Sequence, residues 1–500
     1  MTRHVLVRAD GNGRIGLGHI MRTLSVADEL KRTGAYVTFL CRALPTWAET
    51  QVRERGFGLL ELKCAEKAAQ EEDAAETVKA LEEAGADTVL LDHYGLTEVW
   101  TNHVRTNARP FIVAFDDLAA DARDVDILID SGPGRRALDY EHLIPPDALC
   151  LPGPEYAPLR PEFAMVRAGQ SRTQQGPCQV AISLGGVDPT NATSICLDAL
   201  DTWADVEATV ILSSAAPHLD TVRERVASMG VQTRLLLDRT DMANVLKDMD
   251  IVIGAGGTSA LERCALGLPS VLVLLADNQK YNAANLVKAG AAALAPEISA
   301  SAINDTLGAL VQDTDLRANM GRAAASLCDG RGAPRVAAAM LAAQSGITLR
   351  PVSMDDMSLI YGWQCEPGTR RFSRNPNVPE LEEHKSWFEK RLPKVTQDPF
   401  YIVMSGNEAC GFVRLDSGSA QDAWEVSIVI GQSGQSRGLG RTALGLLRLM
   451  HPERKIEAVV HSENKASQRL FESAGYRRMA ADRFVSDGWQ EIVERQRHDN

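Results

Sequence analysis

A glycine turn followed by hydroxyl side chains has the composition of an anion site. Gly257, Thr258 and Ser259 follow the apolar run 250–256, a pattern that predicts a buried strand, a turn and a helix start. The unpaired N–H groups of a helix start attract a diphosphate. Glu262 lies one turn further on, where its carboxylate could accept two ribose hydroxyls. A nucleotide diphosphate sugar fits both features, although Ser259 and Glu262 also have the spacing of a capping box, which needs no ligand.

A second glycine-rich loop could position a base. The apolar run 4–9 ends at Asp10, and the loop that follows leads into a helix predicted at 18–31. His19 falls in the first turn of that helix, and Arg22 lies one turn later. Because the positive end of a helix disfavours an imidazolium, a neutral His19 could take a proton from water. Glycines let the backbone approach a ligand closely, and the loop contains Gly11, Gly13, Gly16 and Gly18.

A third turn, in the last third of the chain, could hold a pyrophosphate. The β-branched run 426–430 leads into a glycine turn, and an apolar-periodic helix follows. Successive backbone N–H groups in such a turn face one way and bind phosphates. A plain strand-to-helix turn shares these features. If the turn binds a ligand, the contacts are expected at Gln435, Arg437, Gly438, Leu439, Gly440 and Arg441.

The elements that must position these residues alternate between strands and helices. Apolar runs at 35–41, 88–92, 111–116 and 127–130 follow the first strand, with a helix at 73–83. After a boundary at 145–176 the alternation restarts, with strands at 179–184, 208–213, 233–237, 250–253 and 270–275. Short apolar strands separated by helices predict parallel sheets, whose ligands bind at the carboxyl ends of the strands. Those ends carry Asp10, Asp92, Asp116, Gly185 and Gly186.

The last part of the chain has a different character. Four of the seven tryptophans stand at 363, 387, 424 and 489, and the strand-like runs 400–404, 411–415 and 425–430 follow one another closely. This pattern predicts an antiparallel α+β domain, independent of the rest and joined by a short linker near 344–347. We therefore expect an α/β protein with Rossmann-like domains at 1–160 and 161–345 and an α+β domain at 348–500.

Composition restricts the partners. The 500 residues carry a net charge of −13 and no long basic run, which argues against a nucleic-acid surface. The nine cysteines are scattered without a Cys-x-x-Cys pair, so we expect reduced thiols and no metal. The N-terminal segment has charges within its predicted strand, and no run approaches the roughly 20 apolar residues of a membrane span. These features favour a cytoplasmic protein that binds no membrane.

Six motifs, in order across residues 3–340, resemble the UDP-sugar hydrolase family of pseudaminic acid biosynthesis. They fall at 8–10, 15–22, 116–119, 184–188, 256–262 and 278–286. The family is related to the two-domain glycosyltransferase that builds lipid II, which implies a glycosyltransferase-B-like arrangement. The resemblance implies hydrolysis of UDP-2,4-diacetamido-2,4,6-trideoxy-β-L-altrose to UDP and the free sugar. It also implies that His19 activates water. Asp10, Asp92 or Asp116 could assist, and Asn282 could contact the sugar or simply lie on a solvated helix face.

Residues 348–495 resemble the GNAT acetyltransferase superfamily. The glycine turn is followed at the expected distance by Asn464, Phe471, Gly475 and Tyr476. The resemblance implies acetyl-CoA as co-substrate, with its pyrophosphate on 437–441 and Asn464 beside the pantetheine arm. The upstream segment 371–388 resembles the N-acetyltransferase of the same pathway, which acetylates the 4-amino group of the UDP-sugar.

Two positions bear on the chemistry of this domain. Glu425 stands near the expected splay of the central strands, where it could act through water as the base for the amino group. Phe471 stands where the superfamily often has a tyrosine that protonates the leaving thiolate. His461, Ser467 or a water could replace that tyrosine, or the thiolate could leave unprotonated near neutral pH.

Together these features predict a bifunctional enzyme whose ligands are a UDP-sugar and acetyl-CoA. The product of the acetyltransferase domain would be the substrate of the first two domains, and fusion raises its local concentration. Two alternatives stay open. One is a UDP-sugar glycosyltransferase joined to an unrelated acetyltransferase, and the other is a non-catalytic sensor of nucleotide sugar or acetyl-CoA.

Overall fold

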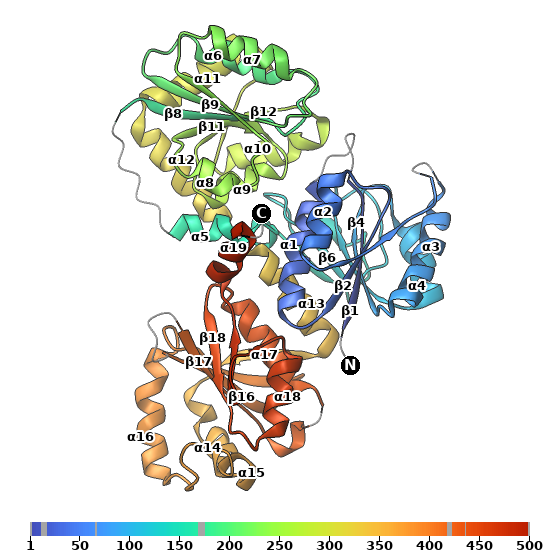
Figure 1. The fold of residues 1–500 in the computed structure, drawn as a ribbon, viewed down its shortest axis with the longest axis vertical. Helices are drawn as coiled ribbons and strands as arrows, with labels where there is room; N and C mark the ends of the chain where they lie inside the picture. Colours follow the sequence, from blue (N-terminus) through green and yellow to red (C-terminus); the bar gives the residue numbers. More distant parts are fainter. Residues whose placement is uncertain are drawn as a thin grey trace.

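Three lobes follow one another along the chain in the computed structural model (Figure 1). The structure describes residues 3–11, 18–65, 68–168, 176–417, 423–435 and 437–498, and the side chains of 495–498 are left out. The expected contact at Gly16 therefore lies outside the described residues. The N-terminal lobe is drawn mainly in blue and teal, the middle lobe in green and yellow, and the C-terminal lobe in orange and red.

The N-terminal lobe is a parallel sheet with helices on both faces. Its strand order is β3-β2-β1-β4-β5-β6-β7. Side chains of a strand alternate between faces, so Val5 and Val7 of β1 pack toward α1, whereas Leu6 packs toward α3 and α4. The bounds are β1 His4–Ala9, α1 Gly18–Arg32, β2 Tyr36–Cys41, α2 Thr46–Glu54, β3 Gly58–Glu61, α3 Gln70–Ala84, β4 Thr88–Asp92, α4 Glu98–Ala108, β5 Phe111–Phe115, β6 Ile127–Asp130 and β7 Leu149–Pro152.

The middle lobe repeats this architecture. Its sheet has the order β10-β9-β8-β11-β12-β13, with α6, α7 and α11 over one face and α8, α9, α10 and α12 over the other. The bounds are α5 Pro161–Ala168, β8 Cys178–Ser183, α6 Ala192–Leu200, β9 Val206–Leu212, α7 Leu219–Ser228, β10 Thr233–Leu237, α8 Met242–Leu246, β11 Ile251–Ala255, α9 Ser259–Ala265, β12 Ser270–Val273, α10 Lys280–Lys288, β13 Ala293–Leu294, α11 Ala300–Gln312 and α12 Thr314–Leu327.

The C-terminal lobe is built on a mixed sheet of order β14-β15-β16-β17-β18-β20-β19. Its central pair, β17 and β18, is parallel, and the neighbouring pairs are antiparallel. Helices α14 and α16 cover one face and α17 and α18 the other. The bounds are β14 Ile347–Pro351, α14 Met357–Cys365, α15 Pro367–Arg370, α16 Leu381–Arg391, β15 Phe400–Ser405, β16 Glu408–Ser417, β17 Ala423–Ile430, α17 Leu439–Met450, β18 Lys455–Val459, α18 Lys465–Ser473, β19 Arg477–Arg478, β20 Arg483–Ser486 and α19 Trp489–His498.

One helix joins the N-terminal and C-terminal lobes. The helix α13 (Gly332–Ser345) follows the middle lobe in sequence, yet it packs between α1 and α17, as Figure 1 also shows. One continuous hydrophobic cluster includes Leu24 of α1, Val336 of α13 and Leu444 of α17. The expected independence of the C-terminal domain is therefore wrong, because its core is shared with the N-terminal lobe.

Candidate active sites

A pocket opens between the N-terminal and middle lobes, at the carboxyl ends of their strands. The N-terminal lobe contributes the start of α1 and the loops after β4, β5 and β6, and the middle lobe contributes the start of α9 and part of α10. Such strand ends are where open parallel sheets bind ligands. Six of the predicted site residues line this pocket: Gly18, His19, Arg22, Gly257, Thr258 and Asn282.

Asp92, at the end of β4, holds His19 and Arg22 together. His19 Nδ1 lies 2.6 Å from Asp92 Oδ1, and Arg22 donates to both carboxylate oxygens at 2.5 and 2.6 Å. Burial alone would raise the pKa of Asp92, but Arg22 and His19 hold it below its ordinary value. An ionised carboxylate only accepts hydrogen bonds, so His19 donates from Nδ1. In the neutral imidazole, Nε2 is then the proton acceptor.

Asp117 and Tyr94 form the wall beside His19. Arg22 donates to both oxygens of Asp117 at 2.9 Å, and the Tyr94 hydroxyl donates to one of them at 2.8 Å. The Tyr94 ring meets the His19 ring edge-on, with 4.7 Å between centroids. Burial and the charge of Asp117 raise the pKa of Tyr94, so the phenol stays protonated. This wall therefore offers a carboxylate acceptor and a phenol to a sugar.

The middle lobe places the start of α9 opposite this wall. Thr258 is the N-cap of α9, and its side chain makes no capping hydrogen bond. Ser259 accepts instead from buried Arg263 at 3.2 Å, so the Ser259–Glu262 capping box does not form. Arg263 also donates to the Ala255 carbonyl at 2.7 Å, and burial lowers its pKa to about 10. A guanidinium thus lies behind the helix start, where it adds positive potential for an anion.

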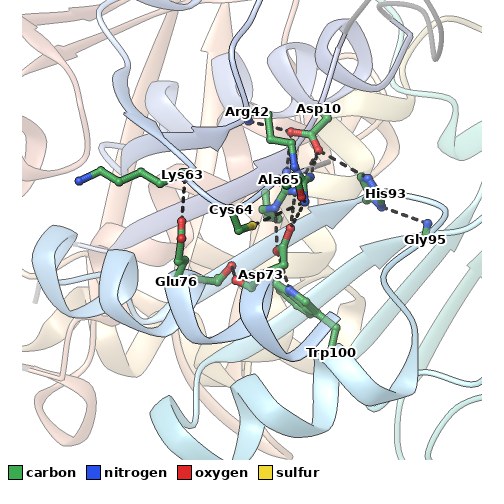
Figure 2. Close-up of polar contacts among 12 residues, drawn as sticks. Asp10, Arg42, Lys63, Cys64, Ala65, Asp73, Glu76, His93, Gly95 and Trp100 are labelled. Carbon is green, nitrogen blue, oxygen red and sulfur yellow. Dashed lines mark hydrogen bonds and ion pairs between the residues drawn. The ribbon is translucent and has the colours of Figure 1, made fainter. Parts of the chain in front are cut away.

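Asp10 is held outside the pocket by a buried network of ion pairs (Figure 2). Arg8 donates to its two oxygens at 2.8 and 2.9 Å, and the Arg42 backbone N–H donates at 2.8 Å. Asp73 binds the same two arginines at 2.7 and 2.9 Å. Burial alone would raise the pKa of Asp10, but the two arginines hold it below its ordinary value. The structure therefore gives Asp10 partners at the end of β1 and does not bring it to the described pocket lining.

Other predicted residues also lie outside the lining that the structure describes. Asp116 accepts from the backbone N–H groups of residues 118 and 119 and from Arg123, at 2.6–3.1 Å, which fixes the loop carrying Asp117. The Glu262 carboxylate lies 3.8 Å from Arg160. Its pKa is raised by burial, against the charge of Arg160. Asp92 also lies outside the lining, but it accepts hydrogen bonds from His19 and Arg22, which line the pocket. The other predicted residues outside the lining are Gly185, Gly186 and Ser259.

The glycine turn of the C-terminal lobe has room for a ligand. Gly438 is the N-cap of α17 with φ 78°, and a Cβ built there would meet nothing within 4 Å. Gly440 packs against Leu470, and buried Leu439 anchors the helix start in the core. The open first turn of α17 suits the pyrophosphate of CoA. The other predicted contacts have protein partners: Gln435 reaches the Ile430 carbonyl at 3.4 Å, Arg437 reaches Ser405 at 3.4 Å, and Arg441 reaches Gly34 at 2.9 Å.

Glu425 stands where the central strands separate. The parallel pairing of β17 and β18 covers residues 423–425 and 455–457 and goes no further, so Glu425 is the last residue of β17 that pairs with β18. Its carboxylate forms an ion pair with Arg374, which follows α15. The role expected for Glu425 as a base stays a prediction, and Arg374 is the group that must move away if Glu425 is to contact an amine.

Asn464, at the start of α18, and Phe471, within α18, both have structural partners. Asn464 caps the helix by accepting from the Ser467 N–H at 3.0 Å. Phe471 is buried and packs against Tyr476 and Phe484, with 5.1 and 5.9 Å between ring centroids. Phe471 is therefore a core residue and offers no proton to a leaving thiolate.

Comparison with known proteins assigns the two parts to classes. Residues 347–477 match the family model of the acetyltransferase (GNAT) domain, and residues 195–333 match that of the glycosyltransferase family 28 C-terminal domain. MurG of Acinetobacter baumannii has a similar fold, with a TM-score of 0.50 at 16% identity over 67% of this chain and 98% of that chain. The protein thus joins a glycosyltransferase-B-like pair of Rossmann-like lobes to a GNAT acetyltransferase domain, which implies acetyl-CoA as co-substrate.

Individual relatives extend this assignment. An uncharacterized protein of Methanocaldococcus jannaschii is 23% identical over 95% of this chain and 96% of its own length. The UDP-2,4-diacetamido-2,4,6-trideoxy-β-L-altropyranose hydrolase of Campylobacter jejuni is 25% identical over 57% of this chain and 97% of its own. The N-acetylglucosaminyltransferase that acts on pyrophosphoryl-undecaprenol in Acidithiobacillus ferrooxidans is 26% identical over 69% and 99%. The chain is therefore a homologue of the hydrolase and is also similar to the transferase.

The described residues include neither a membrane-spanning helix nor a cluster of metal-binding side chains. Across the ranges given above, none of the helices has the length and apolar composition required to traverse a bilayer. Nor do three or more His, Cys, Asp or Glu side chains gather, within those ranges, in a geometry suited to a metal ion.

Some pocket residues were not among the predicted ones. Asp117 follows the predicted Asp116 directly, and Gln279 precedes Asn282 by one helical turn. Ser131, after β6, also lines the pocket. Asp117 could have been found from its place two residues beyond the end of β5 and directly after Asp116, since the side chains of neighbouring residues point in different directions. Arg263 carries no signal in sequence, because only its burial behind Gly254 reveals its position.

Proposed function

We propose that this protein is a bifunctional nucleotide-sugar enzyme that makes the free diacetamido sugar used in nonulosonate synthesis. Its C-terminal domain acetylates the 4-amino group of UDP-4-amino-4,6-dideoxy-N-acetyl-β-L-altrosamine. Its first two lobes then hydrolyse the product to UDP and 2,4-diacetamido-2,4,6-trideoxy-L-altrose. The observation that carries the hydrolytic half is the His19–Asp92 hydrogen bond at the interlobe pocket. Similarity to the Campylobacter jejuni hydrolase supports the choice of substrate.

In the hydrolytic step, His19 acts as the general base. His19 Nε2 takes a proton from water while the water oxygen attacks the anomeric carbon, and the bond from that carbon to the diphosphate oxygen breaks. Asp92 fixes the tautomer and balances the imidazolium that forms. The N–H groups at Gly257 and Thr258, with Arg263 behind them, stabilise the departing diphosphate. Asn282 and Asp117 face the sugar across the pocket.

In the acetyl transfer step, the turn 437–441 holds the pyrophosphate of acetyl-CoA and the splay of β17 and β18 admits its acyl arm. The sugar amine attacks the thioester carbonyl carbon, an amide bond forms, and the CoA thiolate leaves. Glu425 accepts the proton of the amine, directly or through water, once Arg374 has moved from it. Acetylation therefore produces the second amide of the sugar before hydrolysis removes UDP.

A glycosyltransferase activity is the second candidate, because the similarity to the Acidithiobacillus ferrooxidans transferase covers 69% of this chain and 99% of that protein. The test supplies the UDP-diacetamido sugar to the full chain without an added acceptor. UDP and free sugar appearing together in equal amounts support hydrolysis. UDP release that requires a sugar or lipid acceptor supports the transferase instead and contradicts the proposal.

A further inference from the structure

The turn between α1 and β2 docks onto the C-terminal lobe beside the predicted CoA turn. Gly34, at the tip of this turn, has φ 81°, and a Cβ built on it would lie 2.7 Å from the Ser473 carbonyl and 3.5 Å from the Gly475 nitrogen. Arg448, buried in α17, donates to the carbonyls of Arg32 and Ala474. The contact is therefore close-packed main chain against the end of α18, which fixes the N-terminal lobe next to α17.

Arg441 connects the two lobes at this contact. It is one of the residues predicted to hold the CoA pyrophosphate, and it lies in the first turn of α17. Its guanidinium donates to the Gly34 carbonyl at 2.9 Å. The N-terminal lobe thus orients a side chain of the predicted acyl-CoA site, and that site borders on this lobe.

Two further residues of the N-terminal lobe, Arg3 and Tyr36, lie at the same end of the sheet as the Gly34 turn that binds Arg441. The Tyr36 N–H donates to the Arg3 carbonyl at 2.9 Å, so these residues are neighbours at the amino ends of β1 and β2. The Tyr36 side chain is 65% exposed, unusual for a large aromatic residue. Burial lowers the pKa of Arg3, Asp87 opposes this, and the nearby charge of Arg441 lowers it further. Two guanidinium groups and an exposed aromatic ring are therefore gathered at the junction.

We propose that the N-terminal lobe forms one wall of the acyl-CoA site and binds the nucleotide end of the cofactor. Arg3 and Arg441 are the contacts of the 3′-phosphate, and the Tyr36 ring is the stacking surface of the adenine. The pyrophosphate lies on the first turn of α17, so the 3′-phosphoadenosine extends across the junction of the lobes. This inference rests on the acetyl-CoA use in the proposed function and adds a subsite to it.

The test measures binding of CoA and of 3′-dephospho-CoA to the full-length chain by calorimetry. The wild type should bind CoA about a hundredfold more tightly than 3′-dephospho-CoA, about tenfold for each of the two charge-assisted contacts. Arg3→Ala should reduce this preference about tenfold by weakening CoA binding alone, and Arg3→Lys should keep most of it. Tyr36→Ala should weaken both ligands equally. Arg53→Ala, an exposed arginine on α2 of the same lobe, is the matched control and should change neither.

The outcomes separate this inference from the proposed function. Arg3→Ala that keeps the wild-type preference for CoA, with wild-type thermal stability, overturns the 3′-phosphate contact. Unchanged binding by Tyr36→Ala overturns the adenine contact. A wild type that binds neither ligand contradicts the acetyltransferase half of the proposed function as well. A wild type that binds CoA but acetylates no UDP-sugar contradicts that function alone, because the measured quantity here is CoA binding.

Discussion

Replacing Asp92 with asparagine is the most demanding test of the role proposed for the His19–Asp92 pair. The substitution keeps the shape of the side chain and removes its charge. Asp92 now accepts three hydrogen bonds, one from His19 and two from Arg22, at 2.5–2.6 Å. An asparagine has one acceptor oxygen, so its amide N–H₂ must face either the Nδ1–H of His19 or the guanidinium of Arg22.

The size of the effect follows from these contacts. Because a guanidinium can only donate, the amide oxygen should face Arg22 and the amide N–H₂ should face Nδ1 of His19. Arg22 then loses one hydrogen bond and the charge of residue 92 but keeps Asp117, whose side chain is 18% exposed, so we expect a loss of about 2–4 kcal/mol in stability. The wrong tautomer of His19 places a proton on Nε2, which then cannot act as the base. Hydrolysis should therefore slow by about 10²–10⁴-fold, the usual contribution of a general base, with KM changed only a few-fold.

The assay follows UDP release from the preformed UDP-diacetamido sugar, alongside thermal unfolding. Asp73→Asn is the matched control. Asp73 is as buried as Asp92, at 1% exposure, and it forms ion pairs with two arginines, Arg8 and Arg42, but it lies outside the pocket lining. It should cost similar stability and leave the hydrolytic rate within a few-fold of wild type. Equal rate losses in the two variants, or a folded Asp92→Asn variant with full activity, would refute the role given to the His19–Asp92 pair.

The remaining predictions concern the other parts of the chain. Gly438→Val should raise the KM for acetyl-CoA by about tenfold or more while UDP release from the preformed substrate persists, because φ 78° disfavours a branched residue and its side chain would fill the open space expected to hold the pyrophosphate. If steady-state kinetics show loss of both activities in a folded variant, the two-site division is wrong. Gly34→Ala should lower the melting temperature, because a non-glycine residue at φ 81° costs about 1–3 kcal/mol of folding free energy. An unchanged melting curve would contradict the close docking of this turn. Burial, with help from Arg454 and Arg331, lowers the pKa of His451 to about 4, so unfolding takes up a proton. The free energy of unfolding should fall by about 3 kcal/mol as the pH drops from about 6.5 to 4. When this free energy is measured by denaturation and plotted against pH, His451→Gln should give a shallower slope than the wild type. Identical slopes would exclude His451 as the source of the pH dependence.

The strands were predictable because their signals are local. Runs of apolar residues at 4–9, 88–92, 127–130 and 233–237 agree with β1, β4, β6 and β10 residue for residue. Strands β1, β4 and β6 are buried in a parallel sheet, where a strand is a nearly continuous apolar segment between turns. Strand β10 lies at a sheet edge and is only partly buried, but its three consecutive leucines keep the apolar signal. Strand β3 was missed because it lies at the sheet edge, where Gly58 and Glu61 are exposed and the pattern is weak.

The site was predictable in part for the same reason. His19, Gly257 and Thr258 follow directly from strand ends and helix starts, and the fold brings those ends to one pocket. A strand-end position does not determine which way a carboxylate turns. Asp10 is captured by Arg8 and Arg42, and Arg42 comes from 32 residues away. That competition depends on tertiary contacts, so sequence could not separate Asp10 from Asp92.

The docking of the C-terminal lobe also depends on contacts far apart in sequence. Trp489, near the C-terminus, donates from its indole to Glu29 of α1 at 2.7 Å. Arg32 donates to the carbonyls of Pro452 and Asp487 at 3.0 and 3.2 Å. Helix α1 therefore begins at the pocket between the N-terminal and middle lobes and ends at the C-terminal lobe. A compositional change near residue 347 indicated a new domain but not this shared core.

The most direct test of the whole account is to incubate the full-length protein with the UDP-4-amino-2-acetamido-2,4,6-trideoxy sugar, with and without acetyl-CoA, and to identify the products by mass spectrometry. The account predicts UDP and free diacetamido sugar only when acetyl-CoA is present, with an acetylated UDP-sugar as the intermediate. An acetylated UDP-sugar that accumulates intact would contradict the hydrolytic half. No reaction under either condition would contradict the sugar assignment.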